Sequence, residues 1–130
     1  ARTEGLPGPG AVVHAWSGSP EQLRTLQDLG FHMGFGCSLA HPDNRRGPAC
    51  VRASRLDRLH LETDSPDLPP RFLPDWPADR PNEPAQLRLP LATLARLLQL
   101  EAGPLATRLQ ANATAVFGGL LNAERVQEGR

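Results

Sequence analysis

Leu59–Pro70 reads LHLETDSPDLPP, in which leucines alternate with polar side chains before the chain runs into prolines. Because side chains alternate across a β-strand, this pattern predicts a short strand whose residues His60, Glu62 and Asp64 share one face. A buried carboxylate is costly unless it is paired or bound to a cation. Asp64 would end the strand, and the carboxyl ends of parallel strands are where α/β enzymes place their chemistry.

Three short strands are predicted in all, at residues 11–16, 31–35 and 58–63. The first, AVVHAW, is apolar and β-branched and follows a segment of glycine and proline, which favours a buried strand. Helical patterns separate the three strands. Strands that alternate with helices are typical of a parallel α/β sheet, so we expect the strands to be parallel, with an exposed sheet edge.

The helices are predicted over residues 19–30, 49–56, 83–100 and 104–117. Ser19 and Gln22 have the spacing of a capping box at the start of the first helix. Asn82 can cap the third helix, and Pro90 should kink that helix or shift its start. A Gly-Pro pair precedes the fourth helix.

The segment 66–84 holds seven prolines, a density that no regular element survives. We therefore expect an ordered loop that crosses the end of the sheet, with Phe72 and Trp76 as its apolar contacts. His14 lies near the end of the first strand, so His14 and Asp64 could meet at the same end of a parallel sheet.

Imidazole and carboxylate are suitable ligands for divalent ions. His60 lies four residues before Asp64, about 13 Å along a strand, and is too far away to share such an ion. The residues alone leave other readings open. A single histidine after an apolar strand is more often a hydrogen-bonded core or loop residue, and the Glu-Thr-Asp group could be a helix cap or a surface turn.

The composition fits one folded domain, since 39% of the 130 residues are apolar. The formal net charge is zero, which gives no general attraction to nucleic acid or to an anionic membrane. Cys37 and Cys50 form no paired motif and are expected to be free thiols. We see no membrane span and no signal peptide, and expect a cytoplasmic protein. Because the chain does not begin with methionine, it is read as processed or as an excerpt of a longer protein.

Four segments follow one another in this order: VVHAWSGSPEQLRTLQDLGFHMGFG, RLDRLHLETDSPDLPP, RPNEPAQL and LQANATAVFG. In that order they resemble the second half of a TatD-family metal-dependent hydrolase, and the match runs from about Val12 to Phe117. The resemblance implies part of a (β/α)8 TIM barrel of amidohydrolase type, about the last three β/α units. Residues 1–130 would then be the carboxyl-terminal half of one barrel, with 66–84 as its active-site loop.

The resemblance further implies a deoxyribonuclease-like enzyme that cleaves phosphodiester bonds of DNA or of another substrate. His14 and Asp64 would bind divalent metal ions (Mg, Mn or Zn, two per full-length enzyme). Asp64 would also be catalytic, taking a proton from the attacking water. Glu62 would lie one layer deeper and orient a ligand, and Arg71 or Arg80 could meet phosphate.

This sequence departs from the family pattern in two respects. It lacks the opening His-x-His strand, the bridging glutamate and a further histidine, so the 130 residues alone are expected to be inactive; the protein is expected to be a monomer. Asp67 stands where many relatives carry tyrosine, which leaves substrate preference open. One alternative is a catalytically silent scaffold or partner-binding fragment. Another is a helix-turn-helix DNA-binding module at residues 91–113, read by Arg108, Gln110 and Asn112.

Overall fold

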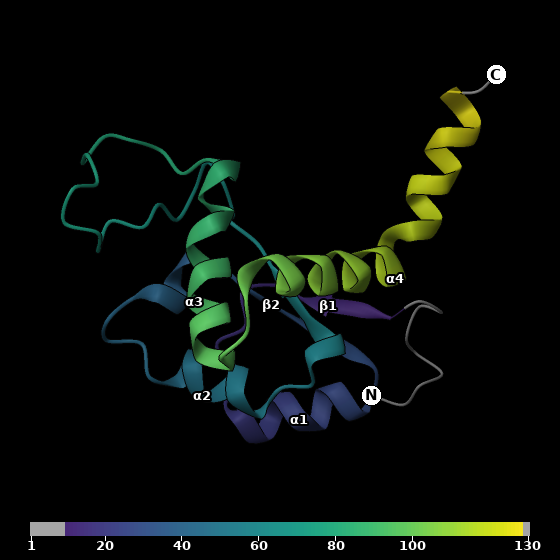
Figure 1. Ribbon diagram of the computed structural model, residues 1–130, viewed down its shortest axis with the longest axis horizontal. Helices are drawn as coiled ribbons and strands as arrows, with labels where there is room; N and C mark the ends of the chain where they lie inside the picture. The colour runs from purple at the N-terminus through teal and green to yellow at the C-terminus, as the bar shows by residue number, and fades with distance from the viewer. Residues whose placement is uncertain (1–9, 129–130) are drawn as a thin grey trace.

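A parallel three-stranded sheet forms the centre of the computed structural model, which describes the backbone of residues 10–128 and the side chains of residues 10–118. The strands are β1 (Ala11–Val13), β2 (Phe31–Phe35) and β3 (Leu59–Leu61), in the spatial order β1-β2-β3 (Figure 1). The three predicted parallel strands are therefore confirmed, although β1 and β3 end earlier than expected. Within the described residues, only β2 has a neighbouring strand on both sides.

Helix α1 (Pro20–Asp28) follows β1 and begins with the predicted capping box. The Ser19 hydroxyl accepts a hydrogen bond from the Gln22 backbone N–H at 3.1 Å, and the Gln22 side chain accepts one from the Ser19 N–H at 3.0 Å. These two bonds satisfy N–H groups that have no partner within the helix. Leu23 on α1 is fully buried, so the cap and the core contact together fix this helix against the sheet.

The remaining elements are η2 (Cys37–Ala40), α2 (Arg46–Ala53), η3 (Leu56–Arg58), η4 (Pro84–Leu87), α3 (Arg88–Leu98) and α4 (Ala102–Glu128). The helix predicted over 83–100 is divided into the 3-10 turn η4 and α3. Pro90 lies in the first turn of α3, where a backbone N–H would have no partner within the helix. The α-helix therefore starts later than predicted and accommodates Pro90 without a break. Helix α4 exists as predicted and is longer.

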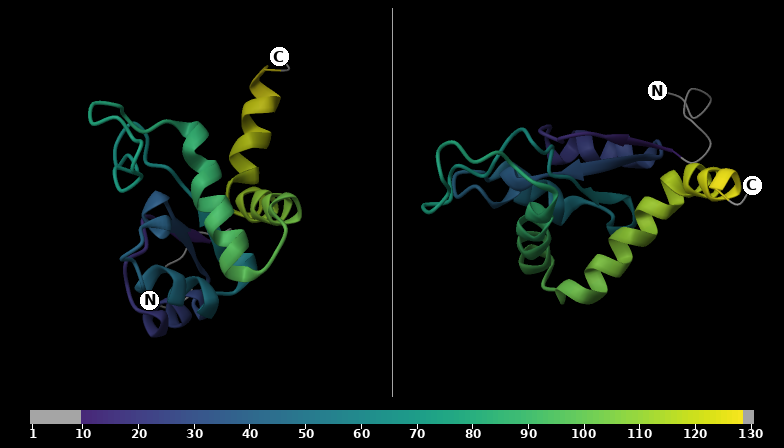
Figure 2. Two further views of the ribbon diagram at one scale, coloured as in Figure 1. Left: turned by 60° about the vertical axis from the view of Figure 1, so that its left-hand side comes forward. Right: turned by 90° about the horizontal axis from the view of Figure 1, so that it is seen from above.

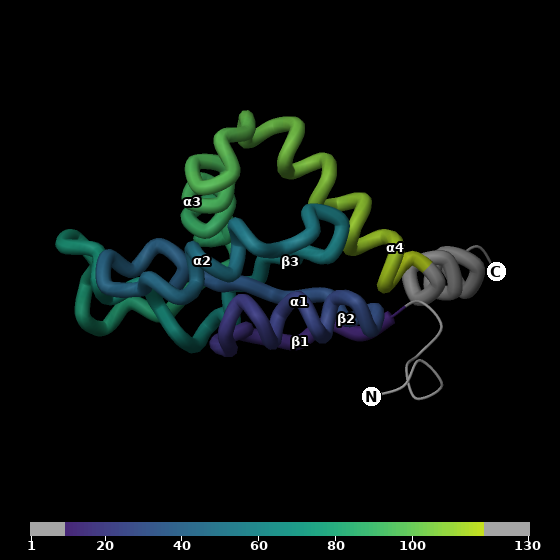
Figure 3. The backbone as a smooth tube through the Cα atoms, turned by 90° about the horizontal axis from the view of Figure 1, so that it is seen from below, coloured from purple at the N-terminus to yellow at the C-terminus, as the bar shows by residue number. Residues whose placement is uncertain are grey.

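The two faces of the sheet differ in chemistry. Met33 and Leu59 are buried on one face in a core cluster with residues of the surrounding helices, among them Val51 of α2 and Leu94 of α3. Figure 3 shows α1 alongside β2, and α4 passing β3. The alternate positions of β2 and β3 turn polar or small side chains to the opposite face, as the period of two requires.

The proline-rich segment forms the predicted loop. No regular element occurs between β3 and η4, and Figures 1 and 2 show this loop extending beyond the ends of the strands. Phe72 is half-buried against the His41 ring, and the Trp76 indole N–H donates to the Arg80 carbonyl at 3.1 Å. Pro70 is fully buried, so the loop is packed onto the body of the protein.

The predicted helix-capping role of Asn82 is wrong. Asn82 is 3% exposed, and its side-chain NH2 donates to the carbonyls of Thr63, Asp67 and Leu68, all in or just before the loop. Its side-chain oxygen accepts only from the next residue, Glu83, and η4 has no side-chain cap. Asn82 therefore ties the start of the loop to its end.

Both cysteines are free and buried, as expected. Cys50 accepts a hydrogen bond from the Trp16 indole at 3.4 Å and donates to the Gly18 carbonyl at 3.3 Å. Within the described residues, no helix combines the length and the apolar character needed to cross a bilayer. The expectation that there is no signal peptide concerns the first nine residues, which lie outside the described part of the chain.

Candidate metal centre

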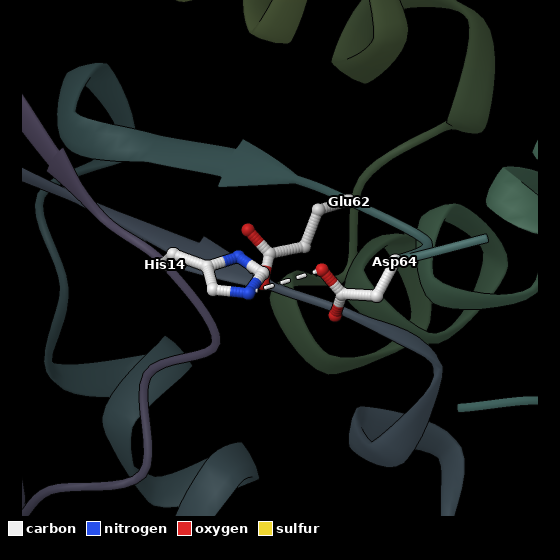
Figure 4. Close-up of side chains that lie close together, drawn as sticks. All are labelled: His14, Glu62 and Asp64. Atoms are coloured by element: carbon white, nitrogen blue, oxygen red, sulfur yellow. Dashed lines mark ion pairs between the residues drawn. The ribbon is translucent and has the colours of Figure 1, made fainter. Parts of the chain in front are cut away.

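A histidine and two carboxylates lie together at the carboxyl ends of the strands (Figure 4). His14 follows β1 directly, while Glu62 and Asp64 follow β3. His14 Nε2 is 3.2 Å from an Asp64 oxygen, and His14 Nδ1 is 3.1 Å from a Glu62 oxygen. The predicted approach of His14 and Asp64 across 50 positions is thus observed.

Strand register explains why these residues meet. Val13 pairs with Met33, which pairs with Leu59, so the residues just beyond these positions face the same end of the sheet. Gly34, between the two outer strands, carries no side chain, and a Cβ there would overlap the Glu62 carboxylate. The space above Gly34 therefore lets the Glu62 carboxylate lie across β2 towards His14.

Glu62 holds both the ring and the backbone of the segment that carries His14. Its Oε1 atom accepts a hydrogen bond from the Ala15 N–H and lies beside His14 Nδ1. Glu62 and Asp64 are equally exposed, at 18% each, and the Glu62 carboxylate lies over Gly34 whereas the Asp64 carboxylate lies near Gly36. The orienting role of Glu62 stays a prediction. The Glu62 side chain reaches up to the level of the cluster and can itself offer a ligand oxygen.

Two residues at the site, one after β1 and one after β3, have an unusual backbone conformation. Ala15 has a φ of 49° and Asp64 a φ of 59°, in the left-handed region that residues with a Cβ seldom adopt. Aspartate tolerates this region better than alanine does. The hydrogen bond from Ala15 to Glu62 helps to hold the first of these conformations.

The carboxylates change the protonation of His14. The hydrogen bond and the charge of Glu62, followed by the charge of Asp64, raise the pKa of His14 above its ordinary value of 6.5. The His14 side chain is 67% exposed, so an ion or a substrate can reach it from solvent.

The donor set fits a divalent cation. One imidazole nitrogen and one oxygen from each carboxylate all lie within 4.8 Å of one another. Nitrogen and carboxylate oxygen are ligand types that zinc and manganese accept. A cation bound to both carboxylates would also offset their mutual repulsion.

His60 takes no part in this cluster, as expected. Its Nε2 lies 2.7 Å from Nδ1 of His32, and both rings are buried. Burial, reinforced by the neighbouring His32, lowers the pKa of His60 to about 4. Sequence reasoning did not find this pair, because His32 carries no motif and only the register of β2 and β3 brings the two rings together.

The loop arginines differ in their availability. Arg80 forms a salt bridge with Glu83 and lies 4.5 Å from the centre of the Trp76 ring, so its charge is already used within the loop. Arg71 is exposed. Contact of Arg71 with phosphate stays a prediction.

Comparison with known proteins shows which family the chain belongs to. Residues 1–118 match the family described as TatD related DNase. The chain belongs to the TatD family. The TatD relatives include a protein of Klebsiella pneumoniae (strain 342), named 3'-5' ssDNA/RNA exonuclease TatD, at 39% identity over 113 residues. Its namesake in Escherichia coli K12 is 34% identical.

Each of these two relatives is matched over 85% of this chain, which spans 42% and 43% of their respective lengths. Among solved structures, a TatD homologue from Escherichia coli K12 superposes with a TM-score of 0.74 at 31% identity, covering 85% of this chain and 41% of its own. A TatD-family hydrolase of Entamoeba histolytica has the same fold, with a TM-score of 0.67 at 16% identity, over 82% of this chain and 42% of its own. The predicted partial barrel of amidohydrolase type is confirmed.

One of the three residues that would contact bases in the helix-turn-helix alternative is buried. Asn112 is 4% exposed, and its side chain donates to the carbonyls of Leu56 and Leu59 at 2.8 and 2.9 Å. An asparagine that holds β3 in place is not free to contact a base. Through Asn112, helix α4 of this TatD chain is held against strand β3.

Proposed function

We propose that this chain forms part of a metal-dependent hydrolase that cleaves phosphodiester bonds of single-stranded nucleic acid, acting from the 3' end as the names of its relatives suggest. The observation that carries the proposal is the group of His14, Glu62 and Asp64 at the carboxyl ends of parallel strands. A catalytically silent scaffold would not need two carboxylates and a histidine gathered at an accessible end of the sheet.

His14 and Asp64 would hold a divalent ion, with Glu62 either as a further ligand or as the group that orients His14. Magnesium, manganese and zinc are the candidates, with two ions in the complete enzyme. A bound divalent ion would lower the pKa of a nearby water and stabilise negative charge on the phosphoryl oxygens.

Asp64 would accept the proton of the attacking water. Its carboxylate is partly exposed beside the cavity that Glu62 also lines, so a water and a phosphate can both approach it. Glu62 keeps Nδ1 of His14 occupied, which turns Nε2 towards Asp64. The Ala15 N–H fixes the Glu62 carboxylate in turn.

The remaining ligands would come from the rest of a complete barrel. The chain spans about two fifths of the length of the relatives it matches, and the sheet described has three strands. We infer that residues 1–130 are the carboxyl-terminal half of one barrel, with 66–84 at the mouth of its active site.

The test is Asp64→Asn in the full-length protein. Asparagine also tolerates the left-handed backbone at this position, so the fold should persist. An amide is a poorer ligand and cannot take a proton, so hydrolysis of single-stranded DNA with manganese or magnesium should fall by roughly a thousandfold.

Asp67→Asn is the matched control, because this exposed aspartate lies three residues after Asp64 and is not part of the His14–Glu62–Asp64 group. Its rate should stay within about twofold of the parent. A rate in the Asp64→Asn protein equal to that of the parent would refute the proposed mechanism.

A further inference from the structure

A cavity of about 260 Å³ lies beside the metal centre. Glu62 and Asp64 line one side of it, and the cavity continues between the segment that follows β2 and the proline-rich loop. A substrate whose phosphate lies at Asp64 would therefore have its adjoining group at this cavity. This volume is close to the lower end of small-molecule pockets in proteins, about 300 Å³, so the cavity can take one small planar group.

Two rings form an aromatic wall in this cavity. Phe72 from the loop and His41 from the end of η2 have ring centroids 5.0 Å apart, with planes tilted by 56°. Both are half-buried, so part of each ring faces the cavity. Leu68 also lines the cavity and is 65% exposed, an apolar surface that a flat ligand would cover.

The polar groups suit the edge of a base. Nδ1 of His41 accepts a hydrogen bond from the Asp43 N–H at 3.0 Å, so in the neutral ring Nε2 carries the proton and can donate. The exposed Ser38 hydroxyl can donate or accept. Bases present acceptors and donors on their edges, and aromatic side chains that stack on unpaired bases are the usual means of binding single strands.

Charge argues against other occupants. Among the described residues that line the cavity, none is lysine or arginine, so nothing there attracts a second phosphate. The charged groups of the lining are Glu62 and Asp64, at the end where we place the metal. The rest of the cavity therefore suits an uncharged planar group.

We propose that this cavity binds the base of the 3'-terminal nucleotide, stacked against Phe72 and His41, while the adjoining phosphate lies at the His14–Glu62–Asp64 group. The inference rests on the proposed function and adds the position of the base. Base–aromatic stacking would contribute roughly a ten- to hundredfold gain in affinity.

The experiment uses the full-length protein with two single-stranded oligodeoxynucleotides. One is ordinary, and the other carries a 3'-terminal abasic tetrahydrofuran residue with the same phosphates. For the parent protein, the abasic end should lower kcat/KM by about tenfold or more. Phe72→Leu should lose a similar factor on the ordinary strand and lose little further on the abasic one, because the two changes remove the same contact.

Phe117→Leu is the matched control, since this half-exposed phenylalanine lies on α4 beside His60 and does not line the cavity. It should retain the preference of the parent for a terminal base. A direct readout is the fluorescence of a 3'-terminal 2-aminopurine, which stacking quenches. Quenching should occur with the Asp64→Asn protein, which binds without cleaving, and should be lost when Phe72→Leu is added.

The outcomes separate the two proposals. If the parent hydrolyses both strands equally well, or if Phe72→Leu leaves the quenching intact, the base site is refuted while the hydrolase stands. If the parent hydrolyses neither strand, the proposed function fails and the base site fails with it.

Discussion

Gly34 leaves the space that the Glu62 carboxylate occupies. In Gly34→Ala the added methyl group would displace that carboxylate from His14 and from the Ala15 N–H. Loss of a group that orients a metal ligand commonly costs ten- to a hundredfold in metal affinity, and about this loss is expected in manganese binding by the full-length protein. Titration calorimetry would measure it.

Gly103→Ala is the matched control, because a Cβ at Gly103 meets nothing within 4 Å. This change should leave manganese affinity unaltered. If Gly34→Ala also binds manganese as the parent does, Glu62 has no role in orienting His14.

The buried His32–His60 pair predicts a dependence of stability on pH. Desolvation and the neighbouring His32 lower the pKa of His60 to about 4, from 6.5 when unfolded. Desolvation also lowers the pKa of His32. The charge of Arg58 lowers it further, whereas the charge of Asp57 raises it. The unfolded chain thus binds more protons between pH 4 and 6.5, so the free energy of unfolding should fall as pH drops through this window.

Urea unfolding at several pH values would measure this fall. His60→Gln keeps a hydrogen-bonding partner for His32 and cannot be protonated, so it should flatten the dependence. An equal slope in parent and variant would mean that other groups cause it.

At the scale of elements, the proline-rich loop depends on Asn82. Asn82→Ala would leave the Thr63, Asp67 and Leu68 carbonyls without their donor. These hydrogen bonds are part-buried, and the loss of each costs about 0.5–1.5 kcal/mol, so the free energy of unfolding should fall by roughly 1–3 kcal/mol. The loop should also be cut sooner in limited proteolysis, read by mass spectrometry.

Asn82→Asp tests the cause, because aspartate keeps the shape and the acceptor but lacks the two N–H donors. It should be destabilised about as much as Asn82→Ala. A stable Asn82→Asp protein would show that the shape of the side chain, rather than its donors, holds the loop.

Local patterns determine which elements the sequence can predict. The capping box at Ser19 and the strand pattern that begins at Leu59 act over a few residues, and both appear, although the strand ends at Leu61. The role of Asn82 could not be predicted, because its partners lie 14 to 19 positions away and depend on the path of the loop. For the same reason the left-handed turn at Ala15 carries no sequence signal.

The same limit applies to the site. His14 and Asp64 were predictable because parallel strands bring their carboxyl ends to one edge, whatever the intervening chain does. The contribution of Gly34 was not, since it requires knowing which β2 residue lies beneath Glu62. Phe72 was predicted as a packing contact, but its partner His41 emerges only from the folded loop.

At the scale of the whole molecule, we predict that the isolated 130 residues neither hydrolyse phosphodiesters appreciably nor bind metal tightly. Three strands cannot close an eight-stranded barrel, and the cluster offers only part of the coordination expected for a metal pair. Elemental analysis after dialysis, together with assays on single-stranded DNA, would compare the isolated chain with the full-length protein. Robust metal-dependent hydrolysis by the isolated chain would contradict the half-barrel interpretation.

Ala15 and Asp64 adopt left-handed conformations beside the candidate metal centre, which matters for engineering this protein. Such a conformation costs roughly 1–3 kcal/mol for a residue such as alanine, and less for aspartate. A library screened only for heat tolerance should therefore be enriched in glycine at positions 15 and 64, and replacement of Asp64 would remove the candidate proton acceptor. A thermostability campaign on this protein should hold position 64 constant and leave position 15 free to vary.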